Sequence, residues 1–462
     1  MPVYNNFTLS TVQAYLADRL YDTTNQFWSL DELNLYINEA LQTWNALTNF
    51  WRGDFLFNTQ QAVTWYDLTD TTNLPNTLRS YNTTFSSLTT IINYHLLEPP
   101  TGSVSKQINS SAITSGITLR SNELLSDTAC TVNPLYTPAT ARRILLPNAL
   151  FDVRRVAYLP AMTTGKGYGS GSYNIGPYGV SRKTGTAQNT VLWREDTYGE
   201  QAFNTQYTTA APGLPSTFLM STQPPVSFDT DCPPGYGGQY EVLYTQALGS
   251  ATTIPVPDDW THVIKWGALA YILSTESNAK DTARAQYCDQ RYKLGIKLLQ
   301  GAAALLAMRI NNEYLQIDSV TSGDQYNAQW QAQSTGRPKG VYQSGLNLFA
   351  FSPVPWDTYS AMATVVQNAP LPDGANPDTS YVQVSQEVLD VILDYAQHIA
   401  SFKMGGAEFV STMPLFQRFL MEAAVYNSKL KEMAEYTTFL LGISQQDEND
   451  DPRLDPEVLA NG

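Results

Sequence analysis

The sequence predicts an α+β protein in which helical hairpins, packed as a bundle, are combined with small antiparallel β units. Segments with apolar residues every three or four positions alternate with short segments in which apolar and polar residues alternate. Capping residues and turns rich in Pro and Gly separate the two kinds of segment. A tract that recurs 123 positions further along the chain indicates that the module of a sheet followed by a helical hairpin is duplicated.

The start of the chain is expected to form a helical hairpin over residues 1–53. In residues 8–22 apolar side chains recur with a helical period. The second helix begins at Ser29, which can close a capping box with Glu32. Its apolar stripe ends near Gly53 and consists of Leu33, Ile37, Ala40, Leu41, Trp44 and Leu47.

Residues 54–190 are expected to be a mixed region of strands and loops. Its expected elements are strands at 55–57 and 63–65, a helix at 84–97, an irregular or strand-containing insertion at 100–138, a short helix at 139–152 broken or kinked at Pro147, and a strand at 153–159. The segment 164–185 is rich in Gly and Tyr, and alternating Gly and aromatics allow many backbone conformations. We interpret it as a long exposed interface loop, with the candidate contact residues Tyr168, Tyr173 and Tyr178.

The repeated tract comprises residues 203–215 (FNTQYTTAAPGLP) and 326–338 (YNAQWQAQSTGRP). Identical residues occupy four equivalent positions, namely Asn204 and Asn327, Gln206 and Gln329, Gly213 and Gly336, and Pro215 and Pro338. Two other positions exchange one aromatic residue for another, Phe203 for Tyr326 and Tyr207 for Trp330. We interpret Gly-x-Pro as a fixed turn that feeds a strand into the sheet, with the aromatic residues packing beneath it.

Two equivalent units are therefore expected, at residues 191–310 and 311–441. In the first, strands at 191–196, 217–220 and 240–244 precede a helix that starts near Asp258 and a long helix from Asp281 to about Met308. In the second, strands at 314–318, 346–351 and 361–366 precede a helix capped by Ser385, a break at Lys403 to Gly406 and a long helix from Met413 to Leu441.

The remaining residues, 442–462, are polar and acidic and include two prolines. Such a tail buries too little apolar surface to offset the entropy lost on ordering, so it is expected to be disordered until it meets a partner. The candidate docking residues are Asp447, Asp450, Asp451 and Arg453.

The composition indicates a protein with extensive subunit contacts. Charged residues make up 15% of the chain, against about 25% in ordinary soluble domains, and aromatic residues make up 12%. Partly polar aromatic side chains suit interfaces. The net charge of −15 argues against a general affinity for phosphate backbones or anionic membranes.

Cysteine usage and the start of the chain indicate a cytoplasmic site of synthesis. The widely spaced residues Cys130, Cys232 and Cys288 are expected to be free thiols in a reducing compartment. The first residues lack a basic region and an apolar run, so no signal peptide is expected. Apolar runs are too short for a spanning helix, so we expect a soluble product.

No group of residues predicts an enzyme, a cofactor or a metal site. His95, His262 and His398 fall in predicted helices without the spacing of metal ligands. The glycines at 165–171 lack the following helix of a dinucleotide site. Asp258 and Asp259 are interpreted as helix-capping carboxylates, and the acidic tail lacks the pattern of a calcium loop.

The order of parts resembles that of structural proteins from tailed bacteriophages. TLSTVQAYLADRLYD and FWSLDELNLYINEALQTWNALTNFWR resemble the N-terminal helical hairpin of virion proteins. Residues 213–306 resemble the head-to-tail connector proteins, also called adaptor or neck proteins, in the order Gly-x-Pro, strand, Pro-rich turn, Tyr-x-Val-x-Tyr, Ile-Pro and two long helices. This chain is much longer than a compact adaptor and its module is doubled, so a neighbouring neck or tail component remains an alternative.

The resemblance implies a homo-oligomeric ring that docks beneath the portal protein and contacts tail or nozzle proteins in the virion, assembled in the host cytoplasm. Double-stranded DNA would pass through the ring during genome ejection without sequence-specific binding. An acidic subunit fits this role because a negatively charged channel repels DNA. No membrane contact is expected.

Two other functions stay open. The first is a tail-associated glycan- or receptor-binding protein, in which Tyr and Trp of the β units and of the 165–179 loop would stack on sugars. The second is an enzyme that hydrolyses peptidoglycan or polysaccharide with a carboxylate.

Overall fold

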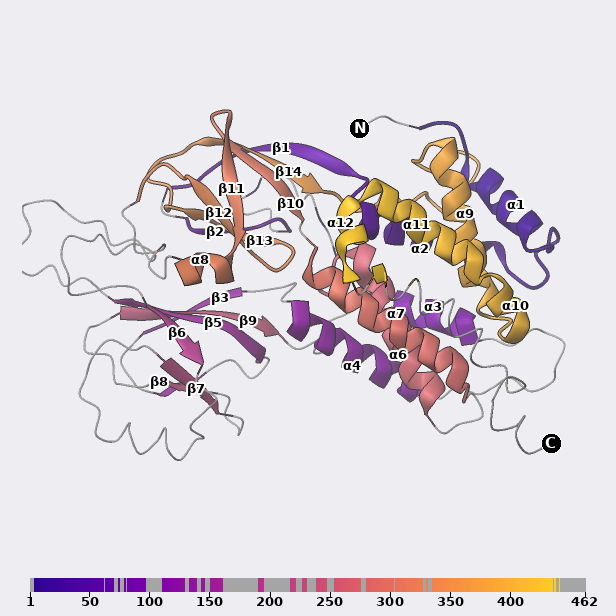
Figure 1. The fold of residues 1–462 in the computed structure, drawn as a ribbon, viewed down its shortest axis with the longest axis horizontal. Coiled ribbons are helices and arrows are strands. Elements are labelled where there is room, and N and C mark those ends of the chain that lie inside the picture. The colour runs from indigo at the N-terminus through magenta and orange to yellow at the C-terminus, as the bar shows by residue number, and fades with distance from the viewer. Residues whose placement is uncertain are drawn as a thin grey trace, which may run out of the picture.

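The computed structural model describes residues 4–61, 63–69, 74, 79, 81–96, 110–128, 133–138, 143–145, 150–160, 190–194, 217–221, 227–230, 238–246, 253–275, 280–302, 304–326, 330, 335–434, 436–437 and 440. The described residues confirm the α+β class, with most helices gathered on one side of the molecule and two sheets, with α8 between them, on the other (Figure 1).

The described helices are α1 (Leu9–Arg19), α2 (Leu30–Thr48), α3 (Phe85–Leu96), α4 (Ser110–Thr128), the 3-10 helix η1 (Asp258–Trp260), α6 (Thr261–Ser274), α7 (Thr282–Gln300), α8 (Val320–Tyr326), α9 (Gln386–Ser401), α10 (Gly406–Ser411), α11 (Met413–Tyr426) and α12 (Ser428–Glu432). The described strands are β1 (Arg52–Asn58), β2 (Trp65–Asp67), β3 (Asn133–Pro138), β4 (Arg143–Leu145), β5 (Leu150–Pro160), β6 (Thr190–Arg194), β7 (Thr217–Ser221), β8 (Ser227–Thr230), β9 (Gly238–Gln246), β10 (Leu305–Ile310), β11 (Glu313–Ser319), β12 (Gly340–Ser344), β13 (Leu348–Ser352) and β14 (Ser360–Val366).

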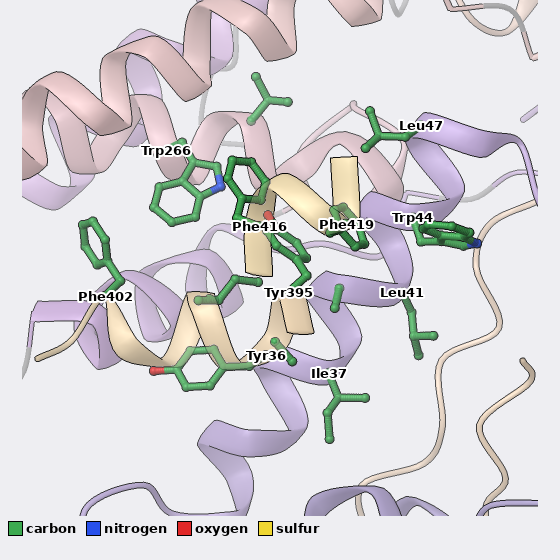
Figure 2. Close-up of a cluster of buried hydrophobic side chains, with 14 of the residues drawn as sticks. Tyr36, Ile37, Leu41, Trp44, Leu47, Trp266, Tyr395, Phe402, Phe416 and Phe419 are labelled. Atoms are coloured by element: carbon green, nitrogen blue, oxygen red, sulfur yellow. The ribbon is translucent and has the colours of Figure 1, made fainter. Parts of the chain in front are cut away.

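The helices bury their apolar faces against one another in one hydrophobic core. This core draws side chains from both ends of the described chain, including α1 and α2 as well as α9 and α11. Close to its centre the rings of Tyr395 and Phe419 stack with their centroids 4.4 Å apart, and Trp44 packs against Phe419 (Figure 2). The predicted N-terminal hairpin is therefore part of a larger helical bundle.

The start of α2 follows the predicted capping box. The Ser29 hydroxyl accepts a hydrogen bond from the backbone N–H of Glu32, and the Glu32 carboxylate accepts one from the backbone N–H of Ser29. Together they satisfy two donors that a helix start otherwise leaves unpaired. The Glu32 carboxylate is also bound by Lys403, so the cap is tied into the bundle.

We expect Ser29→Ala to lower the free energy of unfolding by about 1 kcal/mol, because it removes one of these acceptors. Ser385 precedes α9 but makes no side-chain capping bond, so Ser385→Ala is the matched control and is expected to have a smaller effect. Urea denaturation of both variants measures the difference. Equal losses would show that the hydroxyl of Ser29 does not stabilise the helix through capping.

The two sheets have seven strands each and share one topology. Their strand orders are β1-β14-β10-β11-β12-β13-β2 and β3-β9-β5-β6-β7-β8-β4, and these become identical when the strands of each sheet are numbered in chain order. Among the described strand pairs of each sheet, the one parallel pair joins the fourth and fifth strands in chain order, β11 with β12 and β6 with β7. The two units therefore share strand order and strand direction.

The register of the parallel pair also repeats at the spacing of the repeated tract. Trp193 of β6 pairs with Thr217 of β7, and 123 positions later Gln316 of β11 pairs with Gly340 of β12. A duplicated sheet accounts for this agreement, because register is fixed by which face of each strand is buried.

The extent of each sheet differs from the predicted units. The sheet formed by β3 to β9 (the first sheet) lies in the chain between β2 and β10 of the other (the second sheet). The predicted boundaries at 191 and 311 therefore cut through both sheets. Each sheet is also larger than a small antiparallel unit, because it recruits strands from the preceding region 54–190.

Several predicted elements are wrong. Residues 110–128 of the expected irregular insertion form α4. Part of the expected helix at 139–152 forms β4 and the start of β5, because pairing with β8 and β9 outweighs the local pattern. The helix expected to reach Met308 ends at Gln300, and Leu305–Ile310 form β10.

The last predicted long helix is interrupted. Asn427 has an extended backbone conformation and donates a side-chain hydrogen bond to the carbonyl of Leu47, so α11 ends and α12 begins there. By contrast, the break predicted at Lys403 to Gly406 is confirmed. Gly405 and Gly406 both have positive φ, which a residue without Cβ adopts at low cost.

Candidate functional site

Most candidate contact residues lie outside the described part of the chain. These are Tyr168, Tyr173, Tyr178, Asp447, Asp450, Asp451 and Arg453, together with Asn204, Gln206, Gly213, Pro215, Asn327 and Gln329 of the repeated tract. The thiols Cys130 and Cys232 also lie outside it, whereas Cys288 is a buried free cysteine in α7.

The described part of the repeated tract leads into the second sheet. The backbone N–H of Gly336 donates to the carbonyl of Val354, and Pro338 lies two residues before β12. The Trp330 ring is fully buried. Gly336 forms a parallel bridge with Pro355, so the fixed turn predicted for Gly-x-Pro is wrong at this copy. The Trp330 ring packs against Tyr342 of β12, as predicted for the aromatic residue.

Trp330 belongs to a buried polar centre that joins the two sheets. Arg155 of β5 donates to both carboxylate oxygens of Asp324 in α8, at 2.7 and 3.0 Å. It also donates to Glu241 of β9, at 3.0 Å. Trp330 Nε1–H donates to Asp324, and Trp65 Nε1–H of β2 donates to Glu241. We call these five residues the sheet-junction centre.

The side chains of the sheet-junction centre are all buried, so the charges must satisfy one another. Burial lowers the pKa of Arg155, but Asp324 and Glu241 outweigh it and the net shift is upward. A bidentate guanidinium–carboxylate pair is strong and directional. The centre therefore fixes how the second sheet sits on the first, and it offers no accessible group for catalysis.

A second set of buried charges lies within the helical bundle. Lys265 of α6 donates to the Glu39 carboxylate at 2.5 and 2.6 Å, and its Nζ lies 3.1 Å from His95 Nε2. Burial lowers the pKa of Lys265 to about 8, against the opposing effect of Glu39. Burial also holds the pKa of His95 well below its ordinary value, helped by Lys265.

His398 lies in the same bundle, between two hydroxyl groups. Its Nε2 is 2.7 Å from the Tyr287 hydroxyl and its Nδ1 is 2.9 Å from the Thr412 hydroxyl. Arg291 donates to the Tyr287 hydroxyl, so Tyr287 can donate its own proton to Nε2. Burial lowers the pKa of His398 well below its ordinary value, and the ring is therefore held neutral.

Asp258 and Asp259 lie at the start of η1 as predicted, but they do not cap a helix. Asp258 accepts hydrogen bonds from the backbone N–H groups of Asn82 and Thr83. Asp259 accepts from Asn45 Nδ2 and from the backbone N–H of Ala369. The capping interpretation is wrong because both carboxylates instead tie distant segments to the bundle. Burial raises the pKa of Asp259 to about 6.

An open cavity of about 580 Å³ lies between the end of α7 and the second sheet. Its lining includes Leu299, Gln300, Ile317, Asp318 and Ser322. Among the lining residues that the structure describes, Asp318 is the one carboxylate, and no histidine or cysteine accompanies the two serines. The described lining therefore lacks the paired groups that nucleophilic or acid–base chemistry requires.

The described residues contain no group of three or more His, Cys, Asp or Glu that could hold a metal ion. Within the same residues, no helix is both long and apolar enough to cross a membrane. No protein-family model matches the chain, and no curated protein matches it.

Sequence reasoning missed the sheet-junction centre. The available signal was a charged residue inside a strand, as Glu241 is the one charged residue of GQYEVLYTQ and Arg155 is one of three in LFDVRRVAYLP. Such a residue must either face solvent or find a buried partner. The partner Asp324 could not be identified, because it comes from a distant part of the chain.

Proposed function

We propose that this chain is a structural subunit of the head-to-tail connector of a tailed bacteriophage, forming a ring below the portal through which DNA passes to the tail. One observation carries the proposal. Helical hairpins form one side of the molecule and two stacked sheets of identical topology form the other (Figure 1). A ring built from such subunits would place helices side by side and the sheets on one rim.

The distribution of side chains supports an assembly role. The buried cations Arg155, Lys265 and Lys403 are paired with carboxylates. Large apolar side chains including Leu56, Tyr314 and Val425 are exposed. Exposed apolar groups favour protein contacts when they are gathered in patches. The net charge of −15 suits the wall of a channel, because an acidic wall repels DNA and lets it pass through.

The glycan-binding alternative has less support in the described residues. Among the tryptophans whose side chains the structure describes, all but Trp356 are buried, so they are unavailable for stacking on sugars. Stacking requires an accessible ring face.

We expect the purified full-length chain to form a closed oligomer, alone or with the portal protein of the same virion. Mass photometry and negative-stain images of the chain, with and without portal, test this expectation. Monomers under both conditions would contradict the proposal. A glycan array serves as the control for the alternative, because specific binding to a sugar would favour a receptor-binding role.

A further inference from the structure

The duplication extends from the sheets to the helices. The backbone N–H of Ile254, just before η1 and α6, donates to the carbonyl of Thr83, just before α3. In the same way the backbone N–H of Val382, before α9, donates to the carbonyl of Phe7, before α1. Ile254 and Val382 are 128 positions apart. Helix α6 therefore corresponds to α9, and α3 corresponds to α1.

The same spacing of 128 positions relates α7 to α11. Four buried residues of α7 correspond at this spacing to four buried residues of α11. The pairs are Cys288 and Phe416, Arg291 and Phe419, Tyr292 and Leu420, and Gly295 and Ala423. The two helices thus bury the same face, so their outward faces can be compared position by position.

The outward face is polar in α7 and apolar in α11. The exposed residues Gln286, Lys293 and Lys297 of α7 correspond to the exposed residues Pro414, Met421 and Val425 of α11. Met421 is 58% exposed and Val425 is 64% exposed. We call Pro414, Met421 and Val425 the α11 stripe. Arg418, on the same face, is bound by Asp390 and Asp394, so it brings no unpaired charge to the stripe.

The comparison of the two helices indicates that the α11 stripe serves a contact. The equivalent helix carries polar side chains at the same positions, so the fold does not require apolar ones there. Apolar side chains gathered on an exposed face are typical of a surface that binds another segment or protein.

The last described residues of the chain lie next to this stripe. Helix α12 follows α11 directly, and Leu440 packs against the hydrophobic core to which α11 contributes. Residues 441–462 lie outside the described residues. Leu454 comes 14 positions after Leu440, a reach of up to about 45 Å for an extended chain, whereas a helix of 14 residues such as α11 is about 21 Å long. The tail is therefore long enough to return along α11.

Two features of the tail match this surface in the order in which they would meet it. The acidic run at 447–451 comes first, and the apolar residues Leu454, Val458 and Leu459 follow. A chain that turns back after Leu440 meets α12 first, with the exposed side chains of Lys429 and Lys431, and then the α11 stripe. Charge is complementary at the first point, and apolar surface meets apolar surface at the second.

We propose that the α11 stripe binds the C-terminal tail of the same copy of this chain, with Leu454, Val458 and Leu459 against the stripe and the acidic run against α12. The composition of the tail predicts a segment that orders only on a partner, and the stripe supplies that partner within the chain. The contact does not depend on the connector function, because it forms in the free chain.

Trypsin tests the proposal on the full-length chain. Arg453 is the one basic residue of 441–462, so cleavage after it releases residues 454–462. Met421→Gln combined with Val425→Gln makes the stripe polar, as α7 is, without adding a cleavage site. We expect mass spectrometry to show release of the peptide at least about tenfold faster from this variant than from the unchanged chain, because the tail loses its apolar contact.

Leu56→Gln is the matched control, because Leu56 is 67% exposed and lies on β1, outside the α11 stripe. We expect it to release the peptide as the unchanged chain does. Thermal melting of all variants should match that of the unchanged chain, since the replaced side chains of the described residues are exposed.

Leu459→Gln in the tail provides a second variant that leaves α11 unchanged, and it is expected to speed release in the same way. Combined with the stripe variant it should add no further increase, because both remove one contact. Equal release from the stripe variant and the unchanged chain would overturn the proposal. Protection that rises with chain concentration would also overturn it, because it would assign the stripe to the tail of a second copy.

Discussion

Replacing Arg155 by Ala is expected to lower the free energy of unfolding by about 3–5 kcal/mol, because it removes the buried guanidinium that pairs with the carboxylates of Glu241 and Asp324. All three side chains are almost fully buried, so water cannot replace the lost guanidinium. Chemical denaturation of the full-length chain, followed by tryptophan fluorescence, measures the loss. Trp65 and Trp330 report on this centre because both donate to its carboxylates.

Two further variants distinguish the effect of breaking a buried ion pair on stability from the effect of removing an arginine side chain in general. Arg337 forms an exposed pair with Glu313, so Arg337→Ala should cost no more than about 1 kcal/mol. Combining Arg155→Met with Glu241→Gln and Asp324→Asn removes all three charges and should recover part of the stability lost in Arg155→Ala. If Arg155→Ala proved as mild as Arg337→Ala, the sheet-junction centre would not hold the sheets together.

Acid is expected to destabilise the helical bundle through its buried histidines. His95 and His398 are fully buried, and their pKa values lie well below the ordinary value of about 6.5. Below pH 6.5 the unfolded chain binds protons at these positions while the folded chain does not. Each histidine therefore removes about 1.4 kcal/mol of stability per pH unit as the pH falls below 6.5, down to its folded pKa.

The contacts of each ring explain why the charged form is disfavoured. His95 Nε2 lies 3.1 Å from the Lys265 ammonium, and Lys403, Arg284 and Arg291 add positive potential. His398 Nε2 faces the Tyr287 hydroxyl, which Arg291 already binds. A proton on His95 Nε2 would face a cation, and a proton on His398 Nε2 would face a hydroxyl donor, so neither would find a hydrogen-bond acceptor.

The titration of Asp259 has the opposite effect on stability. Its pKa is raised to about 6, so protonation of the folded state stabilises the protein as the pH falls from about 6 toward 4. Burial also lowers the pKa of His262 to about 3, so His95, His262 and His398 together outweigh Asp259. We expect a net loss of stability between pH 6.5 and 4.5. Denaturation curves across this range measure the slope.

His398→Gln should reduce that slope, because Gln cannot titrate and its amide can still accept from Tyr287. Lys293→Gln, at an exposed pair with Asp289, is the control and should leave the slope unchanged. A slope that is the same in His398→Gln and in the unchanged chain would show that His398 does not titrate in this window.

The sequence patterns correctly predicted those helices and strands that depend on residues close to one another in the chain. The capping box at Ser29 and the alternation in β9 and β14 depend on neighbours within a few positions. The repeated tract also indicated a duplication, and the equal strand orders of the two sheets agree with it.

The sheet boundaries could not be read from the chain, because strand pairing is non-local. β1 pairs with β14, and Arg52 faces Val366 across that pair. The sequence of one strand does not identify its partner strand. The register is set by which face of each strand is buried once the two strands pair. α4 was missed for a related reason. Its sequence has many Ser and Thr residues, and its helical form is stabilised by packing on α6, where Gly116 lies against Tyr271.

The most direct test of the connector function is an image of the intact particle in which this chain carries a label. We expect the label to form a ring between the portal and the tail, with one position for each subunit. A label confined to the distal tip of the tail, or absent from the particle, would contradict the connector function.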